Sequence, residues 1–443
     1  MSTPPDAPPA VRLPRPDLDR LPELTARLAA AAAQHDREGS FPHEGIQAVH
    51  EAGLLTASVA ERHGGPGGGL AQAVRILRAL GAGDPSVALV TAMTLIVHAT
   101  QALDGGWPPE AYAELLAASA RGPALVNHLR VEPELGTPAR GGLPATVARR
   151  EGDHWVLSGH KIYSTGAVGL SHLLVWARTE EEPARVGSFV VRAGSPGLRV
   201  EPTWDHLGLR ASRSDDVWLD RVRVPLGDTL HLSPATEANG ARSGPLSAAW
   251  AALGVTALYL GVAAAARDWL TGFLHRRTPA SLGKPLATLP RFQAEVGEIH
   301  AALTGAELLV DSLAARVDAG DEAAAAQAGV VKLLATRSAI SAVERAVSLV
   351  GNHGLSLSGP LQRHYRDVLC ARVHTPQDDA ILAAAGRAAL DLTGPGRDRA
   401  AAPAAPAGPT GPSDPTGTAG PSDPAGPSGP FAPSRPTPHE KGH

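Results

Sequence analysis

Cysteine is almost absent from this sequence, because Cys370 is the single one among 443 residues. One thiol cannot form an intrachain disulfide, so we expect a reducing, cytoplasmic compartment. An excess of charge is absent too, since 40 lysines and arginines face 44 aspartates and glutamates, for a formal net charge of −4. This balance gives no electrostatic reason to expect nucleic acid or an anionic membrane as a partner.

Long apolar runs are also missing. No window reaches the ~18 unbroken apolar residues that a membrane span needs. Residues 1–20 are proline-rich with mixed charge and lack the apolar stretch of a secretory signal. We therefore expect no membrane association.

Composition divides the chain into five segments. Residues 394–443 are rich in Pro, Gly, Ser, Asp and Ala and contain Gly-Pro-Ser-Asp-Pro twice. Such a segment has little apolar surface to bury, so we expect disorder there and in residues 1–20. Between them we expect an N-terminal helical domain over 21–120, a strand-rich domain over 121–232 and a helical bundle over 233–393.

The three middle segments differ in the period of their apolar residues. Helical spacing predicts helices over Leu21–Gln34, Ser40–Gly53, Leu70–Leu80 and Ser86–Thr100, the last with Asp84 as its N-cap. Short alternating runs follow, with a hairpin signal at Glu151-Gly152-Asp153 and strand-like runs over Leu173–Ala177, Ser188–Arg192, Leu198–Val200 and Val217–Val224. This density of strands predicts a small antiparallel β-barrel.

The third segment returns to long helices. Val343, Ala346, Val347 and Val350 form one apolar stripe, and Gly254–Leu270 is rich in Ala and Gly, which permits close helix packing. The expected fold is mostly α, with a helical domain, a middle antiparallel β-barrel and a C-terminal four-helix bundle.

Short motifs occur along the whole of this region. They are Phe41-Pro42, Glu61–Gly65, Glu132–Thr137 (Glu-Pro-Glu-Leu-Gly-Thr), Gly159–Gly166 (Gly-His-Lys-Ile-Tyr-Ser-Thr-Gly), Trp204–Ser214, Val222–Pro225, Gly283–Leu286 with Phe292 and Gln293, Gly351–Leu355 and Arg363–Asp367. In this order and at these spacings the chain resembles the acyl-CoA dehydrogenase superfamily over about residues 20–393. The resemblance implies a flavin between barrel and bundle.

Two groups of residues match the superfamily's cofactor-binding positions. Near the flavin ring, the matches are Glu132, Gly136, Thr137, Tyr163, Ser164 and Thr165, where amides and hydroxyls on a rigid barrel supply hydrogen bonds. The alternative for these residues is a barrel turn stabilised by local hydroxyl–backbone bonds.

The second group matches positions that hold the far half of FAD, in part from a second subunit. These matches are Arg276, Arg277, Gln293, Gly351 and Gly354, with Pro279 where the family has an arginine. The resemblance therefore implies FAD, with FMN as the alternative. It also implies a homodimer or homotetramer.

The family's catalytic glutamate has no counterpart. It commonly stands nine residues after the arginine of an Arg-Asp pair, and here the pair is Arg366-Asp367 and the ninth residue is Thr375. Threonine cannot act as a base near neutral pH. Residues 238–266, where some relatives place the base, contain no acidic residue. Asp378 and Asp379 remain, either as unorthodox bases or as the capped start of a helix.

His374 occupies this gap, and it resembles the histidine of flavin monooxygenases that share the fold. Such enzymes need a proton partner beside the flavin and a dry pocket. The alternative is a surface or structural histidine.

Three functions stay open at this point. The first is an oxygen-using flavin oxidoreductase acting on a small organic substrate. The second is an acyl-thioester dehydrogenase with an unorthodox base, and the third is an inactive flavin-binding or assembly partner. The enzyme readings allow a flavin reductase or an electron-transfer protein as a partner.

Two further patterns mimic known sites. Gly64–Gly69 lacks the following Lys-Ser/Thr and the preceding strand of a phosphate loop, so we expect a turn. His439–His443 has the spacing of a zinc-protease motif, but it ends a Pro/Gly-rich segment that cannot present both imidazoles on one helix face. No metal site is expected.

Overall fold

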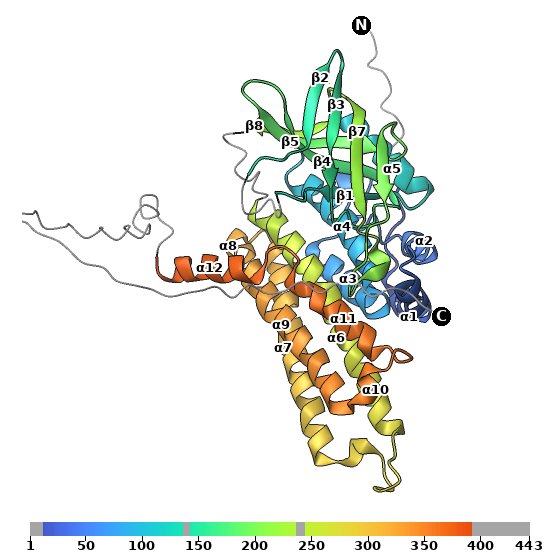
Figure 1. Ribbon diagram of the computed structural model, residues 1–443. Coiled ribbons are helices and arrows are strands. Elements are labelled where there is room, and N and C mark those ends of the chain that lie inside the picture. Colours follow the sequence, from blue (N-terminus) through green and yellow to red (C-terminus); the bar gives the residue numbers. More distant parts are fainter. Residues whose placement is uncertain (1–11, 136–141, 236–243, 392–443) are drawn as a thin grey trace, which may run out of the picture. The chain divides into compact units, whose positions relative to one another are not determined.

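A computed structural model describes residues 12–135, 142–235 and 244–391 of the chain. The chain divides into a compact unit, residues 1–390, and a second unit, residues 391–443, of which only Asp391 is described. All described helices and strands lie in the first unit (Figure 1).

Five helices form the N-terminal part. They are α1 (Leu21–Glu38), α2 (His43–Glu51), α3 (Leu70–Gly83), α4 (Pro85–Leu103) and α5 (Pro109–Arg121), with short 3-10 turns η1 (Leu18–Arg20) and η2 (Glu61–His63). The first four confirm the helices expected from apolar spacing, and α5 was not expected. The Asp84 carboxylate accepts from the amides of Ser86 and Val87 and so begins α4, as the N-cap signal predicts.

Eight strands follow. They are β1 (Leu125–Leu129), β2 (Val147–Glu151), β3 (His154–Lys161), β4 (Leu170–Thr179), β5 (Arg185–Arg192), β6 (Leu198–Glu201), β7 (Asp216–Pro225) and β8 (Thr229–Pro234), with the 3-10 turn η4 (Arg210–Ser212) between β6 and β7. The expected hairpin is present as the antiparallel pair of β2 and β3.

The prediction of an antiparallel barrel needs correction. The strands form one mixed sheet in the order β6-β7-β3-β2-β4-β5-β8, with β1 added beside β4. Both β1 and β2 run parallel to β4. Alternating apolar residues indicate which face of a strand is buried, but they are the same for parallel and antiparallel neighbours, so the pattern could not reveal these directions. No pairing joins β6 to β8 among the described strands.

The C-terminal part is helical. Its helices are α6 (Pro245–Arg276), α7 (Pro290–Asp318), α8 (Glu322–Ala325), α9 (Ala328–Val350), α10 (Asn352–Leu355), α11 (Leu361–Leu369) and α12 (Asp378–Ala389), with 3-10 turns η5 (Leu286–Thr288) and η6 (Cys370–Arg372). Helices α6, α7, α9 and α11 pack against one another. The structure is mostly helical, as expected.

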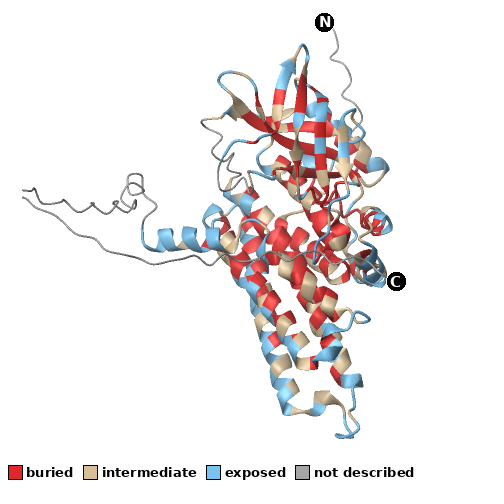
Figure 2. Cartoon of the chain, viewed as in Figure 1, coloured by how far each residue is buried: buried red, intermediate tan, exposed pale blue. Residues whose placement is uncertain are grey.

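Helix α6 is the centre of the core. It packs on α3 and α4 as well as on α9 and α7, and buried residues follow it over most of its length (Figure 2). Two glycines permit the close crossing with α3. A Cβ on Gly81 would lie 2.3 Å from the Leu258 carbonyl oxygen, and one on Gly261 would lie 2.1 Å from that of Arg78. By length and hydropathy α4 and α6 pass as membrane spans, but most of their residues are buried inside this fold.

Candidate active site

The turn between β3 and β4 carries a buried hydroxyl without a partner. Ser164 is 1% exposed, and its Oγ has no hydrogen-bond partner among the described residues. The neighbouring Thr165 hydroxyl lies 3.1 Å from the Ser214 Oγ, and the Gly166 amide donates to the Ser212 carbonyl at 2.9 Å. Buried polar groups are nearly always paired, so an unpaired Oγ in a rigid turn is the environment that a flavin edge would complete. The residues present fit the cofactor that the motif implies.

An aromatic patch lies beside this turn. Tyr163 is 56% exposed and has a backbone φ of 56°. Its ring meets those of Trp204 and His206 edge to face, at centroid distances of 6.3 and 5.9 Å, and these two stack on each other at 3.7 Å. A large exposed aromatic side chain next to an unpaired hydroxyl is a surface on which a planar ring can pack.

Glu132 is fully engaged by other protein groups. Its carboxylate accepts from the Lys161 ammonium at 2.5 Å, from the Thr146 hydroxyl at 2.6 Å and from the Ala145 amide at 2.6 Å. The side chains of Glu132 and Lys161 are 2% and 0% exposed. Through Lys161, the Glu132 carboxylate therefore connects the end of β3 to the loop that begins at Glu132. The two other expected loop residues, Gly136 and Thr137, lie outside the described residues.

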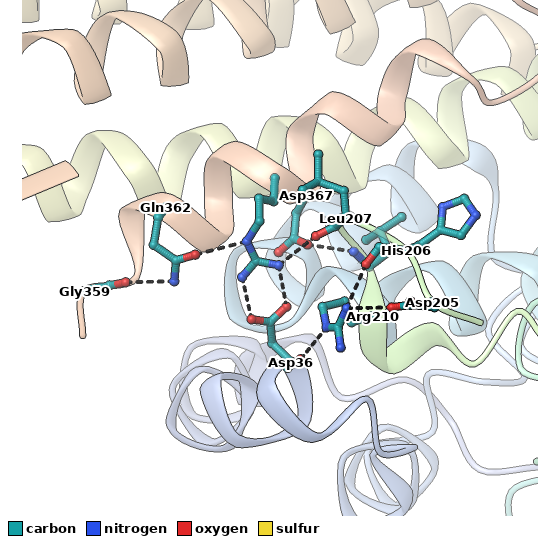
Figure 3. Close-up of polar contacts among 10 residues, drawn as sticks. Asp36, Asp205, His206, Leu207, Arg210, Gly359, Gln362 and Asp367 are labelled. Atoms are coloured by element: carbon teal, nitrogen blue, oxygen red, sulfur yellow. Dashed lines mark hydrogen bonds and ion pairs between the residues drawn. The ribbon is translucent and has the colours of Figure 1, made fainter. Parts of the chain in front are cut away.

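Helix α11 is connected to the loop before β7 and to α1 (Figure 3). The Arg366 guanidinium pairs with both oxygens of Asp36 and donates to the Leu207 carbonyl at 2.7 Å. The Asp367 carboxylate accepts from the Leu209 amide at 2.7 Å, and burial raises its pKa to about 7. This loop also carries Ser214, which contacts the Thr165 hydroxyl, and Ser212, which accepts from the Gly166 amide, so α11 and the Ser164 turn are held by one continuous segment.

His374 lies between α6 and the end of α11. Its Nδ1 is 2.7 Å from the Tyr259 hydroxyl and 3.2 Å from the Cys370 carbonyl oxygen. Burial, with a smaller contribution from the charge of Lys332, lowers the pKa of His374 to about 4, so the imidazole is neutral near pH 7. His374 is therefore no freely exposed surface histidine.

The two carboxylates that follow His374 in the sequence, Asp378 and Asp379, contact other groups of the chain. Asp378 lies 3.3 Å from the Arg337 guanidinium, and the Asp379 carboxylate accepts from the Ala380 amide at 2.9 Å. Both stand in the first turn of α12, so they lie at a helix start as expected, but the N-cap is Gln377 and no described side chain caps the helix. Thr375 is exposed.

The second group of expected cofactor residues lies at the end of the bundle far from the sheet (Figure 1). Arg276 ends α6 and Arg277 follows it, while Gly351 precedes α10 and Gly354 lies within it. The two segments are neighbours, since the rings of Phe273 and His353 are 5.0 Å apart. The Gln293 side chain, on α7, donates to the Ala287 carbonyl at 3.0 Å. Within one chain, the structure does not bring this group to Ser164.

Sequence reasoning missed Tyr259 and Lys332, the two buried polar side chains nearest to His374. The available signal was weak. Tyr259 is the single tyrosine in an otherwise apolar stretch of α6, and Lys332 is one of few lysines in the chain. Neither feature indicates that the side chain lies near His374.

The glycine-rich segment before α3 is a turn, as predicted. The amides of Leu70 and Ala71 donate to the Asp318 carboxylate at 2.6 and 2.9 Å. The first donors of α3 are thus occupied by a carboxylate rather than open to a phosphate. His439–His443 lies outside the described residues, and among those that are described no cluster of His, Cys, Asp or Glu could hold a metal ion.

Family models agree with the motifs. The N-terminal, middle and C-terminal domains of acyl-CoA dehydrogenases match residues 23–112, 131–222 and 253–378. The chain is 30% identical over 370 residues to YdbM of Bacillus subtilis, a protein named as an acyl-CoA dehydrogenase, with 82% of this chain and 94% of that one covered. The chain belongs to the acyl-CoA dehydrogenase family.

Proteins with names other than dehydrogenase match as well. The chain is 32% identical over 369 residues to L-evernosamine nitrososynthase of a Micromonospora species, covering 79% of this chain and 84% of that one. Among solved structures, KijD3 in complex with FMN and dTDP-3-amino-2,3,6-trideoxy-4-keto-3-methyl-D-glucose is 28% identical, with a TM-score of 0.69, and the match covers 84% of this chain and 93% of that one. The proteins that the chain resembles thus include dehydrogenases, a nitrososynthase and a protein solved with FMN.

Proposed function

We propose that this chain is a flavin-dependent oxidoreductase that uses O₂, in the manner of the monooxygenases of its family. The single observation that carries the proposal is His374. A neutral imidazole, held by Tyr259 and the Cys370 carbonyl, stands beside the position where dehydrogenases carry a glutamate. Such a group can donate a hydrogen bond to a reacting oxygen near neutral pH.

The acyl-thioester dehydrogenase is the second candidate, and the structure weighs against it. Removing the α-proton of a thioester requires a carboxylate, and general-base catalysis contributes typically about 10²–10⁴-fold. Thr375 cannot supply it, and both nearby aspartates are engaged in the first turn of α12. An inactive flavin-binding or assembly partner is the third candidate. The unpaired Ser164 hydroxyl supports flavin binding in all three candidates, and turnover distinguishes this one from the enzymes.

The proposed cofactor site is the turn of Ser164 and Thr165 with the face of Tyr163. When bound there, the flavin supplies the redox chemistry, and these side chains bind and orient its ring. FMN gains support over FAD from two facts. KijD3 is seen with FMN, and Pro279 replaces the arginine that relatives use for the FAD pyrophosphate.

The proposed substrate class is a small organic amine, such as an amino sugar, because two relatives carry such a compound in their names. We propose a separate flavin reductase as the electron source and a homo-oligomer as the functional particle. If the cofactor is FAD rather than FMN, Arg276, Arg277 and Gly351–Gly354 of one copy would hold its far half in a neighbouring copy.

Two experiments test the proposal. Flavin titration should show that Ser164→Ala weakens FMN binding about five-fold, the equivalent of roughly 1 kcal/mol for one hydrogen bond, while Ser233→Ala on β8 leaves it unchanged. A protein that binds neither FMN nor FAD would refute the flavin proposal.

The second experiment supplies reduced flavin, O₂ and amino-sugar substrates. His374→Ala should lower product formation and divert O₂ to hydrogen peroxide, with flavin affinity kept. The matched control is His275→Ala, an exposed histidine on α6. If instead Asp378→Asn or Asp379→Asn abolishes reduction of the flavin by an acyl-CoA, the dehydrogenase candidate is correct.

A further inference from the structure

Three polar side chains from three separate elements meet inside the helical bundle. Tyr259 on α6 and Lys332 on α9 are each 0% exposed, and His374 follows η6. The Tyr259 hydroxyl is 2.7 Å from the His374 Nδ1, and the Lys332 ammonium donates to the Ala371 carbonyl at 3.4 Å. Leucine or methionine would fill the same volume without the cost of burying polar groups, so packing alone does not account for this group.

Lys332 is held in an unusual way. Among the described residues it forms no ion pair within 4.0 Å, and its hydrogen bond goes to a main-chain carbonyl on η6. A buried ammonium without a carboxylate partner is costly. Ala371 stands three residues before His374, so this bond fixes the segment from which the imidazole projects.

Two oxygens compete for the His374 Nδ1. If Nδ1 carries the hydrogen, it donates to the Cys370 carbonyl, 3.2 Å away, and the buried Tyr259 hydroxyl then has no described acceptor for its own hydrogen. If Nδ1 is bare, it accepts from Tyr259 at 2.7 Å, the shorter contact. Buried hydroxyls are rarely left without an acceptor, which favours the second arrangement. The hydrogen of the ring then resides on Nε2.

We propose that Tyr259 and Lys332 are positioning residues for His374: the Tyr259 hydroxyl selects the Nε2–H form of the imidazole, and Lys332 sets the path of the segment that carries it. In this form His374 presents a hydrogen-bond donor through Nε2 rather than a basic nitrogen. The inference rests on the proposed function for its role in the reaction, while the tautomer itself is a property of the folded chain.

The surrounding charges agree with a neutral ring. Burial is the main cause that lowers the pKa of His374, and the Lys332 charge adds to it. Burial also lowers the pKa of Lys332, which the Asp378 charge partly offsets. Of the titratable groups around His374, Tyr259 contacts the ring and Lys332 acts on it through its charge, while Asp367 and Cys370 act on Tyr259 and Asp378 acts on Lys332.

The test is NMR of the full chain with ¹⁵N-labelled histidine, without flavin and with FMN, in which ring nitrogen shifts distinguish a protonated from a bare nitrogen. The His374 signals are identified by their loss in His374→Gln. We expect a bare Nδ1, a protonated Nε2 and no titration between pH 5 and 8. An Nδ1–H form, or an imidazolium at pH 6, would overturn the proposal.

Two variants separate positioning from mere packing. Tyr259→Phe keeps the ring but removes the hydroxyl, so the His374 hydrogen should move at least in part to Nδ1 and the Cys370 carbonyl. Tyr365→Phe on α11 is the control and should leave the His374 signals unchanged. An unchanged tautomer in Tyr259→Phe would contradict the role of Tyr259.

Lys332→Met removes the smaller of the two causes that lower the pKa of His374, so it should shift the His374 ring signals and raise the titration midpoint, while burial still keeps that midpoint below its ordinary value. Lys332→Gln serves the same purpose if the methionine variant does not fold. Unshifted signals in the folded variant would refute the role of Lys332. Neither readout requires turnover. If the tautomer is as expected but reduced flavin and O₂ yield no product, the proposed function fails and the positioning of His374 stands.

Discussion

Replacing Glu132 by glutamine tests the structural role of its buried ion pair with Lys161. The substitution keeps the shape of the side chain but leaves the Lys161 ammonium, 0% exposed, without its counter-charge. Removing one partner of a buried pair costs about 3–5 kcal/mol. In a fold of this size about 2 °C of melting temperature corresponds to each kcal/mol, so we expect a drop of about 6–10 °C.

The matched control is Glu134→Gln, two residues along the same loop. Glu134 is exposed and forms no ion pair among the described residues, so the identical chemical change should alter stability by less than about 0.5 kcal/mol. Urea unfolding followed by tryptophan fluorescence, on protein without flavin, measures both variants. Equal stability of the two variants would refute the buried pair.

The penalty should also depend on pH with a definite sign. Burial already lowers the pKa of Lys161 to about 8 in the presence of Glu132, so in the variant the folded protein holds a neutral amine at neutral pH. The unfolded chain keeps the ammonium up to its ordinary pKa of ~10.4. Raising the pH from 7 to 9 therefore stabilises the variant more than the wild type. The difference in unfolding free energy between the two proteins should shrink by roughly 1 kcal/mol.

Three further predictions concern the fold. In Gly261→Ala the new Cβ would lie 2.1 Å from the Arg78 carbonyl oxygen, so the variant should lose at least about 1–3 kcal/mol of unfolding free energy. Gly297→Ala on α7, with open space around it, should be neutral or gain up to about 1 kcal/mol. Equal effects of the two substitutions would contradict the close crossing of α3 and α6. Burial lowers the pKa of His98 in the folded protein to about 4. Below the ordinary histidine pKa of ~6.5 the unfolded chain takes up a proton there that the folded chain does not, so stability falls as the pH drops. Between pH 6.5 and 5 this loss of stability is about 2 kcal/mol, and it should disappear in a folded His98→Gln variant. Deleting residues 400–443, which composition sets apart from the rest of the chain, should leave melting temperature and flavin affinity unchanged, and a decrease of several degrees would show that this segment docks.

Local signals in the sequence were sufficient for most helices and for the existence of the strands. The start of α4 follows from Asp84, whose side chain caps it in the structure as expected. The directions of the strands could not be predicted from the sequence. Whether β2 pairs with β4 in parallel depends on how the chain crosses over, and period-two alternation carries no information about that.

The candidate site, too, was only partly predictable from the sequence. Ser164 was identified by its motif, and the structure adds that its hydroxyl is buried and unpaired. For Glu132 the motif pointed to the cofactor, but the structure shows the carboxylate bound by Lys161, because a buried charge requires a counter-charge. The contact of His374 with Tyr259 joins residues 115 positions apart, so only the folded chain reveals it.

Anaerobic mixing of the flavin-loaded protein with octanoyl-CoA tests the central claim most directly, with flavin absorbance as the readout. In the proposed function no carboxylate is available to take the α-proton of the thioester. The flavin should therefore remain oxidised over many minutes, while chemically supplied electrons followed by O₂ and an amine substrate give oxidised product. Rapid bleaching of the flavin by octanoyl-CoA without oxygen would contradict the account and show that the protein is a dehydrogenase.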